Sequence, residues 1–563
     1  MQYTDSLPAH NAESLLVHFR RAELLKERAM EFKSVNLNPR QLCDLDMLLN
    51  RAFYPLDGYL GRKDYESVLS DMRLSDGTLW PLPICLGVSE EFATSLEEGE
   101  YVAVRDAEGF MLAVLTVSDI WKPDLQAEAR AIRGGLARPE RLDGCCCGLD
   151  EPWYIGGRVE GVSYPQRYDF TDIRLTPAEV QRFFAQKGWR KVMAVQAGRP
   201  LHQADRAMLE DIAREQGANL LLSPQLKPSM YFSVDHFSLV RSFQRFAETF
   251  PRSLAKLNLT PWFQRHMGPR GALLRAIVSK NYGCTHMLVW DGAKAEPKRN
   301  ALSEDYEAHI CWLAERREET GIAPVAEHCM ALDKGTGRYV RSETGGRCVN
   351  DHDAVVDLLT RGESVPEWMS FPEVLKELSR IHKPRWKQGV ALFFTGLSGA
   401  GKSTLAKVLF VKLLELNGRP VTLLDGDIVR TNLSSELSFS TEHRNLNVAR
   451  IGFVASEIVK NGGVAICAPI APYAESRVQA RKAVEEYGGF VEIHVSTPLS
   501  VCEQRDRKGL YAKARSGIIK GVTGVDDPYI EPDNPELRID TSELSPNEAA
   551  REVLLYLNEH QFI

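Results

Sequence analysis

The stretch GLSGAGKS, residues 396–403, decides the fold of the last third of the chain. It follows the apolar run VALFFT and precedes the amphipathic run STLAKVLF, so a predicted strand and a predicted helix flank it. Glycines at this spacing let backbone N–H groups turn inward around phosphate oxygens, and the helix N-terminus adds positive potential. The pattern predicts a phosphate-binding loop in an α/β domain with a parallel sheet, and it predicts that this domain binds a nucleoside triphosphate.

Each position of the loop has an expected role. Lys402 is expected to reach the β- and γ-phosphates, and the Ser403 hydroxyl is expected to bind Mg2+. A glycine-rich turn that matches by chance is the competing interpretation, which the flanking strand and helix disfavour. The residues predicted to bind ATP are Gly396, Leu397, Ser398, Gly399, Ala400, Gly401, Lys402, Ser403 and Thr404.

Two aspartates follow the next predicted strand, in PVTLLDGDIVR. Asp425 and Asp427 are expected at the carboxyl edge of the sheet, where ligands bind in open α/β folds. A carboxylate there can accept a substrate hydroxyl proton or hold a Mg2+-bound water during phosphoryl transfer. In the alternative interpretation, an aspartate only caps the following helix.

A basic run, QRDRKGLYAKARSGIIKGVTG, lies further along the chain. It is either a solvated helix face or a lid that closes on phosphate charge, and its spacing favours neither. Its cationic residues are Arg505, Arg507, Lys508, Lys513, Arg515 and Lys520.

Length, charge and cysteine use narrow the class of protein. The 563 residues suggest three or four domains at roughly 150 residues each. A net charge of -7 argues against a nucleic-acid binder. The N-terminus lacks the features of a signal peptide, and no apolar run is long enough to span a membrane. The 11 cysteines fit a reducing compartment, and the adjacent Cys145–Cys147 suit a thiol-rich loop better than a metal site. A cytoplasmic, multidomain protein is expected.

The distribution of apolar runs, turn residues and helix-like segments divides the chain into four parts. Residues 1–170 mix short strands with Pro/Gly turns and include a hairpin around DAEG, which predicts a β-rich domain. Residues 171–345 alternate short apolar runs with helix-like segments, which predicts an α/β domain with a parallel sheet. Residues 346–388 read as a helical connector, and residues 389–563 form the domain with the phosphate loop.

Residues 389–545 resemble adenylyl-sulfate (APS) kinases, which phosphorylate the 3'-hydroxyl of APS with ATP to give PAPS. The resembling runs include FFTGLSGAGKSTLA, LLDGDIVR, FSTEHRNLN, CEQRDRKGLYAKARSG and IKGVTGVDDPYIEPDNPEL. The resemblance implies that Asp427 faces the acceptor hydroxyl, with Lys402 and Asp425 as further catalytic residues. It implies that APS is bound by Asp427, Arg430, Phe439, Arg444, Asn447, Ile470, Ala471, Lys508, Gly521 and Val522.

Two of these positions depart from the APS kinase pattern. Ala471 stands where many relatives have serine, and Val522 stands where many have a phenylalanine that stacks on the adenine. Loss of one stacking face costs roughly 1–3 kcal/mol of base binding if nothing replaces it. Weaker binding of APS, with retained activity, is expected.

The front of the chain resembles ATP sulfurylase, which makes APS and pyrophosphate from ATP and sulfate. LNPRQLCDLDMLLNRAFYPLDGYLGRKDY resembles its N-terminal, PUA-like domain, and GPRGALLRAIVSKNYGCTHMLV resembles its Rossmann-like nucleotidyltransferase domain. The two families occur fused. Sulfurylases carry the signature Q-x-R-N-P-x-H-x-x-H. Here Gln196 and His202 remain, whereas Gly198, Arg199 and Asp205 replace the arginine, the asparagine and the second histidine.

These replacements predict an impaired and inactive sulfurylase site. A carboxylate at position 205 places negative charge beside the triphosphate, at a cost on the order of 4 kcal/mol. Relatives also carry G-R-D-H where this chain has Trp290, Asp291, Gly292 and Ala293. Gly271 and Arg275 stand where relatives usually carry a glutamate and a histidine. His202 and Asp205 are then expected to be an exposed pair on a helix.

Three functions follow from this comparison. In the first, which the residues favour, an APS kinase carries an inactive sulfurylase-like scaffold. In the second, Arg199 replaces the lost charge and the protein is a bifunctional ATP sulfurylase and APS kinase. In the third, the front half is a regulatory module that binds APS or PAPS. Both families form homo-oligomers, so the resemblance implies one here, with ATP and APS as the small-molecule substrates.

Overall fold

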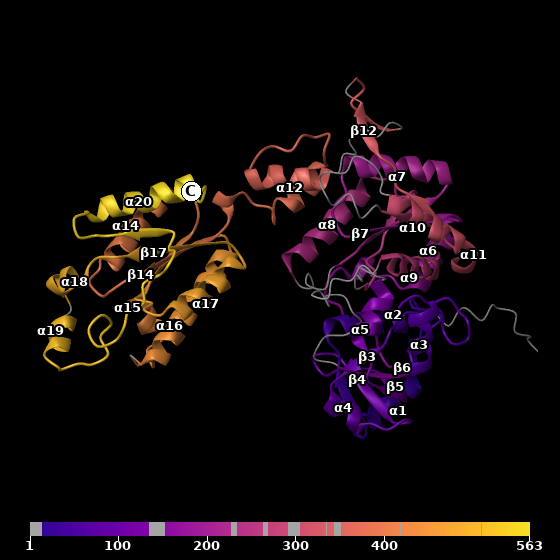
Figure 1. Ribbon diagram of the computed structural model, residues 1–563. Coiled ribbons are helices and arrows are strands. Elements are labelled where there is room, and N and C mark those ends of the chain that lie inside the picture. The colour runs from indigo at the N-terminus through magenta and orange to yellow at the C-terminus, as the bar shows by residue number, and fades with distance from the viewer. Residues whose placement is uncertain are drawn as a thin grey trace, which may run out of the picture. The chain divides into compact units, whose positions relative to one another are not determined.

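The computed structural model describes residues 14–133, 152–226, 233–262, 268–290, 304–333, 335–342, 351–416, 418–438, 440–507 and 509–563. The chain divides into two compact units (Figure 1). The first comprises Met1–Asp357 and Val365–Ile381, and the second comprises Leu358–Ser364 and His382–Ile563. Each unit has its own hydrophobic core.

The first unit begins with a mixed sheet in the order β1-β4-β5-β6-β2, with β3 paired to β6. The predicted hairpin is confirmed, since β4 and β5 pair antiparallel across the DAEG turn. The strands are β1 (Lys33–Asn36), β2 (Gly58–Tyr59), β3 (Leu86–Val88), β4 (Tyr101–Arg105), β5 (Met111–Trp121) and β6 (Trp153–Gly161). The helices are α1 (Phe19–Glu27), α2 (Pro39–Leu49), α3 (Arg62–Asp71), α4 (Glu90–Ser95) and α5 (Leu125–Arg133).

The same unit continues with a parallel sheet in the order β11-β10-β7-β8-β9. Its strands are β7 (Val192–Ala197), β8 (Asn219–Pro224), β9 (Ala255–Leu257), β10 (His286–Val289) and β11 (Ala323–Ala326). An antiparallel hairpin, β12 (Met330–Asp333) and β13 (Arg338–Arg341), follows. The helices are α6 (Pro177–Lys187), α7 (Gln203–Gln216), α8 (Val234–Glu248), α9 (Gly268–Asn281), α10 (Glu304–Glu315) and α11 (Arg317–Thr320).

Local sequence signals set the ends of these helices, as α6 illustrates. The side chain of Thr176 accepts from the backbone N–H of Glu179, and the Glu179 side chain accepts from the backbone N–H of Thr176. Pro177 occupies the first turn, where its missing N–H is not needed. Gly188 ends the helix in the left-handed region, at φ 69°.

Two helices lie in the predicted connector, α12 (Asp351–Arg361) and α13 (Pro372–Leu378). Helix α13 packs on α8 within the first unit. The Nε of Arg241 on α8 donates to Glu377 on α13 at 2.8 Å, and the Glu377 side chain is only 4% exposed. Part of the connector therefore belongs to the sulfurylase-like unit and contributes to its interior.

The second unit is a five-stranded parallel sheet in the order β15-β16-β14-β17-β18. Its strands are β14 (Val390–Thr395), β15 (Val421–Asp425), β16 (Val464–Ala468), β17 (Gly489–Val495) and β18 (Leu537–Ile539). Its helices are α14 (Lys402–Glu415), α15 (Gly426–Asn432), α16 (Thr441–Lys460), α17 (Ala474–Glu485), α18 (Leu499–Arg505), α19 (Leu510–Arg515) and α20 (Pro546–Glu559).

Helices cover both faces of this sheet, with α14 and α20 on one side and α16 and α17 on the other (Figure 1). Every residue of β14 and β16 is buried, as their uninterrupted apolar sequences require. The predicted architecture is confirmed: a mixed N-terminal sheet, a central parallel sheet and a C-terminal parallel sheet that carries the phosphate loop. The exact boundaries of the four-part division stay a prediction.

Candidate active site

The phosphate loop joins β14 to α14 in a conformation that requires its glycines. Gly396 has φ 148°, and a Cβ there would lie 2.5 Å from the carbonyl oxygen of Val495. Gly401 caps α14 at φ 104°, in the left-handed region that favours glycine. Lys402 is only 6% exposed, and its Nζ donates to the carbonyls of Gly396 and Leu397 at 2.8 and 2.7 Å. The loop therefore surrounds the lysine ammonium with its own backbone.

A hydroxyl and a carboxylate lie side by side next to the loop. The Oγ of Ser403 donates to Oδ1 of Asp425 at 3.2 Å, and Asp425 is 8% exposed at the end of β15. Both are hard oxygen ligands of the kind that Mg2+ prefers, with phosphate oxygens and water completing an octahedron. Among the described residues, no group of three or more His, Cys, Asp or Glu could hold a metal by itself. This pair suits a metal that arrives with its nucleotide.

One cavity of about 1080 Å³ connects the phosphate loop with the residues predicted to bind APS. From the loop side it is lined by Ser398, Gly399, Gly401, Lys402, Ser403, Thr404 and Asp425. From the other side it is lined by Arg430, Arg444, Asn447, Ile470, Ala471, Gly521 and Val522. Two sets of residues predicted independently, from a motif and from a resemblance, therefore share one cavity.

Arg444, on α16, is held by the segment that closes this cavity. Its Nη1 donates to Oγ1 of Thr523 at 2.6 Å and to Oδ2 of Asp527 at 2.5 Å, and its Nη2 donates to the carbonyl of Gly521. The Tyr473 hydroxyl also donates to Asp527, at 2.9 Å. The sequence analysis did not single out Thr523, Asp527 or Tyr473. The acidic run VDDPY beside the resembling glycine was the available signal.

Asn447 lines the cavity and has a side-chain acceptor without a partner in the described part of the chain. The residue is 7% exposed, and its Oδ1 is buried and makes no hydrogen bond there. A buried polar atom without a partner is costly, so such an atom in a ligand cavity suits a ligand donor such as a hydroxyl.

Three predicted residues lie wholly or partly outside the described structure. Phe439 and Lys508 lie outside the described residues, and of Asp427 only the backbone is described, within α15. Their predicted roles therefore stay predictions.

Different residues of the basic run fit the two interpretations given for it, a lid that faces phosphate and a solvated helix face. Arg505, Arg507 and Lys520 line the cavity, as a phosphate-facing lid requires. Arg505 also donates to the side chain and carbonyl of Thr541 at 2.8 and 2.6 Å. These bonds connect α18 to Thr541, which also lines the cavity. By contrast, Arg515 pairs with Glu503 at 2.7 Å on an exposed surface.

The two departures from the APS kinase pattern occupy structural positions. Val522 is 8% exposed and belongs to the core cluster on the α14 side of the sheet. Ala471 is 1% exposed and adopts φ 44°, a left-handed conformation that residues with a Cβ disfavour. Both residues also line the cavity, so the local backbone contributes directly to its shape.

The sulfurylase-like residues meet at the carboxyl end of β7 in the first unit. Gln196 receives a hydrogen bond on its carbonyl from the Trp290 indole at 2.6 Å, and Gly198 begins the turn to α7. Arg199 donates to both carboxylate oxygens of Asp205 at 2.9 and 2.8 Å and lies over the Trp290 ring at 5.3 Å. The residues that follow Trp290, 291–293, lie outside the described structure.

The expectation of an exposed His202–Asp205 pair is wrong. His202 is 1% exposed and Asp205 has a side chain that is 12% exposed. His202 is the N-cap of α7, and its backbone N–H donates to Oδ2 of Asp205 at 2.8 Å. Burial raises the pKa of Asp205, but Arg199 and His202 together lower it by more, so the carboxylate stays charged. Asp205 thus caps α7 through the backbone N–H of His202 and forms an ion pair with Arg199. The positive charge of Arg199 offsets the negative charge of the Asp205 carboxylate.

Both ring nitrogens of His202 contact side chains from the connector. Nδ1 lies 2.7 Å from Oγ of Ser370, and Nε2 lies 3.2 Å from Nδ1 of His352 on α12. The two imidazoles stack at 5.5 Å between centroids. Burial lowers the pKa of His202 to about 3, so the ring is neutral at physiological pH. Sequence spacing gave no signal for these contacts, since the partners lie 150 and 168 residues away.

This burial makes the stability of the first unit depend on pH. An unfolded histidine takes up a proton near pH 6.5, whereas folded His202 does so near pH 3. Between these values the unfolded state binds more protons, so the free energy of unfolding falls as the pH drops. We expect His202→Gln to reduce that slope by up to about 1.4 kcal/mol per pH unit. Denaturant unfolding from pH 7 to pH 4 measures it, and an unchanged slope would contradict the buried neutral ring.

Two residues on α9, Gly271 and Arg275, stand where sulfurylases typically carry other residues. Arg275 is half-buried, and burial lowers its pKa to about 10. Gly271 is buried one turn earlier on the same helix. Arg275 therefore adds a half-buried cation to the central domain.

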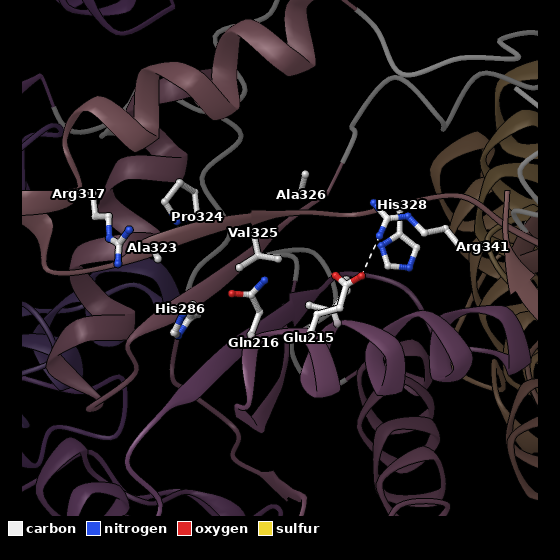
Figure 2. Close-up of a pocket in the computed structure, with 11 residues that line it drawn as sticks. Glu215, Gln216, His286, Arg317, Ala323, Pro324, Val325, Ala326, His328 and Arg341 are labelled. Carbon is white, nitrogen blue, oxygen red and sulfur yellow. Dashed lines mark hydrogen bonds and ion pairs between the residues drawn. The ribbon is translucent and has the colours of Figure 1, made fainter. Parts of the chain in front are cut away.

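A second, polar cavity of about 360 Å³ lies beside the edge strand β11 (Figure 2). His286, His328, Arg317 and Arg341 line it, and Figure 2 shows Glu215 directed toward His328 and Arg341. Arg341 is paired with Glu215 at 2.9 Å. None of the residues predicted for either site lines this cavity in the described part of the chain.

The phosphate loop, the Ser403–Asp425 pair and the shared cavity define the C-terminal unit as a P-loop kinase domain. The adenylylsulphate kinase family matches residues 388–540, the ATP-sulfurylase family matches residues 171–381 and the PUA-like domain family matches residues 9–164. The chain belongs to the family of proteins in which a PUA-like domain, an ATP-sulfurylase domain and an APS kinase domain are fused.

Relatives align over almost the whole chain. Sulfate adenylyltransferase of Phaeosphaeria nodorum is 40% identical over 549 residues, which cover 96% of this chain and 95% of the relative. Sulfate adenylyltransferase of Mycosarcoma maydis is 40% identical and covers 96% of each chain. A solved structure, the hexameric APS kinase from Thiobacillus denitrificans, is 38% identical, covers 98% of each chain and superposes with a TM-score of 0.78.

These relatives bear on the choice among the functions considered above. The adenylyltransferases share both the sulfurylase and the kinase parts, so the comparisons favour the bifunctional alternative over an inactive sulfurylase domain. No helix in the described parts of the chain has the length and apolar character to cross a membrane.

Proposed function

We propose that the C-terminal domain transfers the γ-phosphate of ATP to the 3'-hydroxyl of adenylyl sulfate, giving PAPS and ADP. The observation that carries the proposal is the single cavity of about 1080 Å³, which has the phosphate loop at one end and Arg430, Arg444 and Asn447 at the other. Phosphoryl transfer needs donor and acceptor in line, and one continuous cavity allows that arrangement.

At the ATP end, the chain supplies charge rather than covalent chemistry. Lys402 stabilises the β- and γ-phosphates, and the loop N–H groups bind their oxygens. Ser403 and Asp425 would hold Mg2+, which neutralises phosphate charge when it is bound. Asp427 follows Asp425 by two residues at the same sheet edge and is proposed to accept the proton of the attacking hydroxyl.

At the APS end, the ligand is an anion with a nucleoside attached. Arg430 and Arg444 are proposed to bridge the phosphate and sulfate oxygens, because planar guanidinium groups form charge-assisted bonds with such groups. Substrate oxygens then replace the Asp527 carboxylate that pairs with Arg444 at 2.5 Å. Asn447 supplies its unpaired Oδ1 to a ligand hydroxyl.

Substitution of Arg444 tests this assignment. We expect Arg444→Met to raise the KM for APS about 10- to 100-fold, because a lost hydrogen bond to a charged group costs about 1.5–3 kcal/mol. The KM for ATP should change much less. Arg450→Met is the matched control, since Arg450 lies on the same helix and pairs outside the cavity with Glu436 at 2.7 Å. Equal effects of the two variants on the KM for APS would refute the role.

A second activity, sulfate adenylyltransferase, is favoured by the relatives that carry this name. The residues at the end of β7 support a different proposal for this chain, namely that its sulfurylase site is degenerate and turns over slowly or not at all. Arg199 is engaged by Asp205, and His202 is neutral and in contact with Ser370 and His352. These groups are then unable to offer positive charge to a triphosphate.

We also propose that this chain forms a homo-oligomer. The T. denitrificans APS kinase is described as hexameric, and this supports a homo-oligomer for the present chain. The predicted cytoplasmic location stays a prediction. Size-exclusion chromatography with light scattering measures the oligomeric state.

A further inference from the structure

A strained turn forms one wall of the kinase cavity. Ile470 and Ala471 follow β16 and line the cavity, and Ala471 adopts φ 44° although it has a Cβ. L-residues other than glycine disfavour this region, so surrounding contacts must hold the turn in place. Ala471 is 1% exposed, and its carbonyl oxygen receives two hydrogen bonds from side chains.

The first contact comes from Thr395, the last residue of β14. Its Oγ1 lies 2.8 Å from the carbonyl of Ile470, 3.1 Å from that of Ala471 and 2.9 Å from the hydroxyl of Tyr529. Carbonyls only accept, so the single hydroxyl hydrogen of Thr395 is directed to them and Tyr529 donates to Thr395. Burial raises the pKa of Tyr529 to about 12, which keeps its proton in place.

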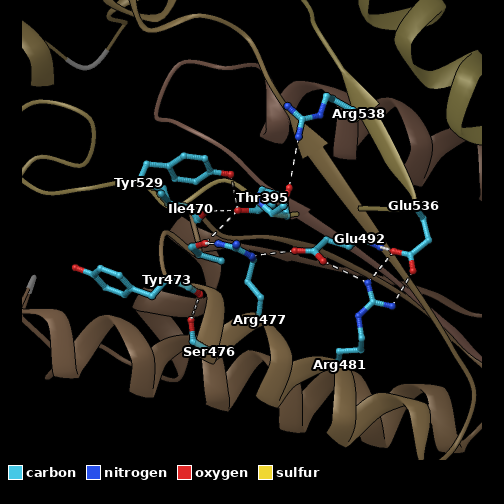
Figure 3. A network of polar contacts seen from close by, with 12 residues as sticks. Thr395, Ile470, Tyr473, Ser476, Arg477, Arg481, Glu492, Tyr529, Glu536 and Arg538 are labelled. Carbon is cyan, nitrogen blue, oxygen red and sulfur yellow. Dashed lines mark hydrogen bonds and ion pairs between the residues drawn. The ribbon is translucent and has the colours of Figure 1, made fainter. Parts of the chain in front are cut away.

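The second contact comes from Arg477 on α17 (Figure 3). Its Nη1 donates to the carbonyl of Ala471 at 2.8 Å, and its Nε lies 2.9 Å from Oε1 of Glu492 on β17. The side chains of Arg477 and Glu492 are 4% and 10% exposed. Moving the buried Arg477 guanidinium away from Glu492 would leave a buried charge without this carboxylate, which opposes such a movement.

The turn is also joined to the phosphate loop. The backbone N–H of Gly396, the first loop residue, donates to the carbonyl of Ile470 at 3.2 Å. Thr395 directly precedes this glycine, so residues 395–396 link the phosphate loop to the turn. This link enters the loop at its first residue, whereas the turn itself lines the APS end of the cavity. A shift of the turn would therefore alter the APS wall more than the ATP loop.

We propose that Arg477 is a positioning residue for APS: with Thr395 it holds Ala471 in its strained conformation and so shapes the APS wall of the cavity. This role rests on the proposed kinase function. Arg477 does not line the cavity itself. It acts through the carbonyl of Ala471, whereas Glu492 fixes the direction of its guanidinium.

Arg481 offers a matched control on the same helix. It pairs with Glu536 at 2.7 Å and with Glu492 at 3.3 Å, and Figure 3 shows it directed away from the Ile470 turn. Arg481→Met thus removes a guanidinium from the same polar network without touching Ala471. If Arg477 only stabilises the fold, the two variants should affect kinetics alike.

The test measures KM and kcat for both substrates in purified full-length chains. We expect Arg477→Met to raise the KM for APS about tenfold or more, with the KM for ATP within about twofold of wild type. Arg481→Met should lower the thermal unfolding midpoint and leave the KM for APS unchanged. Adding Ala471→Gly to Arg477→Met should recover part of the lost affinity, since glycine adopts φ 44° without strain.

Thr395→Val covers the case in which Arg477→Met fails to fold. It removes the donor to both carbonyls without exposing a charge, and it too should raise the KM for APS. A folded Arg477→Met or Thr395→Val chain with an unchanged KM for APS would overturn the proposal. Equal shifts for both substrates, or an equal effect of Arg481→Met, would overturn it as well. An inactive wild-type chain would instead refute the kinase function itself.

Discussion

Lys402→Met is expected to lower the rate of APS phosphorylation about 10³-fold, the scale on which removal of a transition-state cation acts in such enzymes. Lys402 is the cation inside the phosphate loop, where its ammonium is bonded to two loop carbonyls and is nearly inaccessible to water. Developing charge on the transferred phosphoryl group would lose its nearest positive partner. Steady-state rates of PAPS formation from ATP and APS measure the effect.

Lys412→Met is the control for this substitution. Lys412 lies on the same helix, α14, and its ammonium pairs with Glu415 at 2.9 Å on an exposed surface. Its loss removes the same charge from the chain without changing the cavity. A Lys402→Met enzyme as fast as the Lys412→Met enzyme would rule out the phosphate loop as the site of transfer.

Formation of ATP from APS and pyrophosphate is expected to be at least about 10²-fold slower than formation of PAPS by the wild-type chain. The physical reason is the bidentate Arg199–Asp205 pair, together with a neutral, buried His202. These groups would have to rearrange before they could stabilise charge at the α-phosphorus. The assay is run on Lys402→Met protein, so that the kinase domain does not consume the APS.

The opposite result has an equally clear meaning. Comparable rates of ATP and PAPS formation would establish the bifunctional alternative that the sulfate adenylyltransferase relatives favour. Arg199→Met would then be the decisive variant. Loss of ATP formation in that chain would show that Arg199 supplies the charge that Gly198 lacks.

The kinase domain was the most predictable part of the molecule. GLSGAGKS is a local signal, and the glycine conformations that it implies occur at Gly396 and Gly401. Apolar runs such as VALFFT predicted strands of a buried parallel sheet because such runs have no polar face. The carboxyl edge of that sheet then brought Asp425 next to Ser403, as its topology requires.

Contacts between distant segments were not predictable in the same way. His202 was expected at the surface because its site was interpreted as inactive, but His352 on α12 and Ser370, which precedes α13, lie against its ring. The Arg444–Asp527 pair and the strain at Ala471 likewise depend on tertiary packing. Spacing along the chain carries no information on which distant side chain will meet a given one.

The measurement that tests the central claim most directly is incubation of the full-length chain with ATP, APS and Mg2+, followed by chromatographic separation of the nucleotides. The account predicts that APS is converted to its 3'-phosphorylated product with release of one ADP for each molecule formed. Consumption of APS without a 3'-phosphorylated product, or no consumption at all, would contradict it.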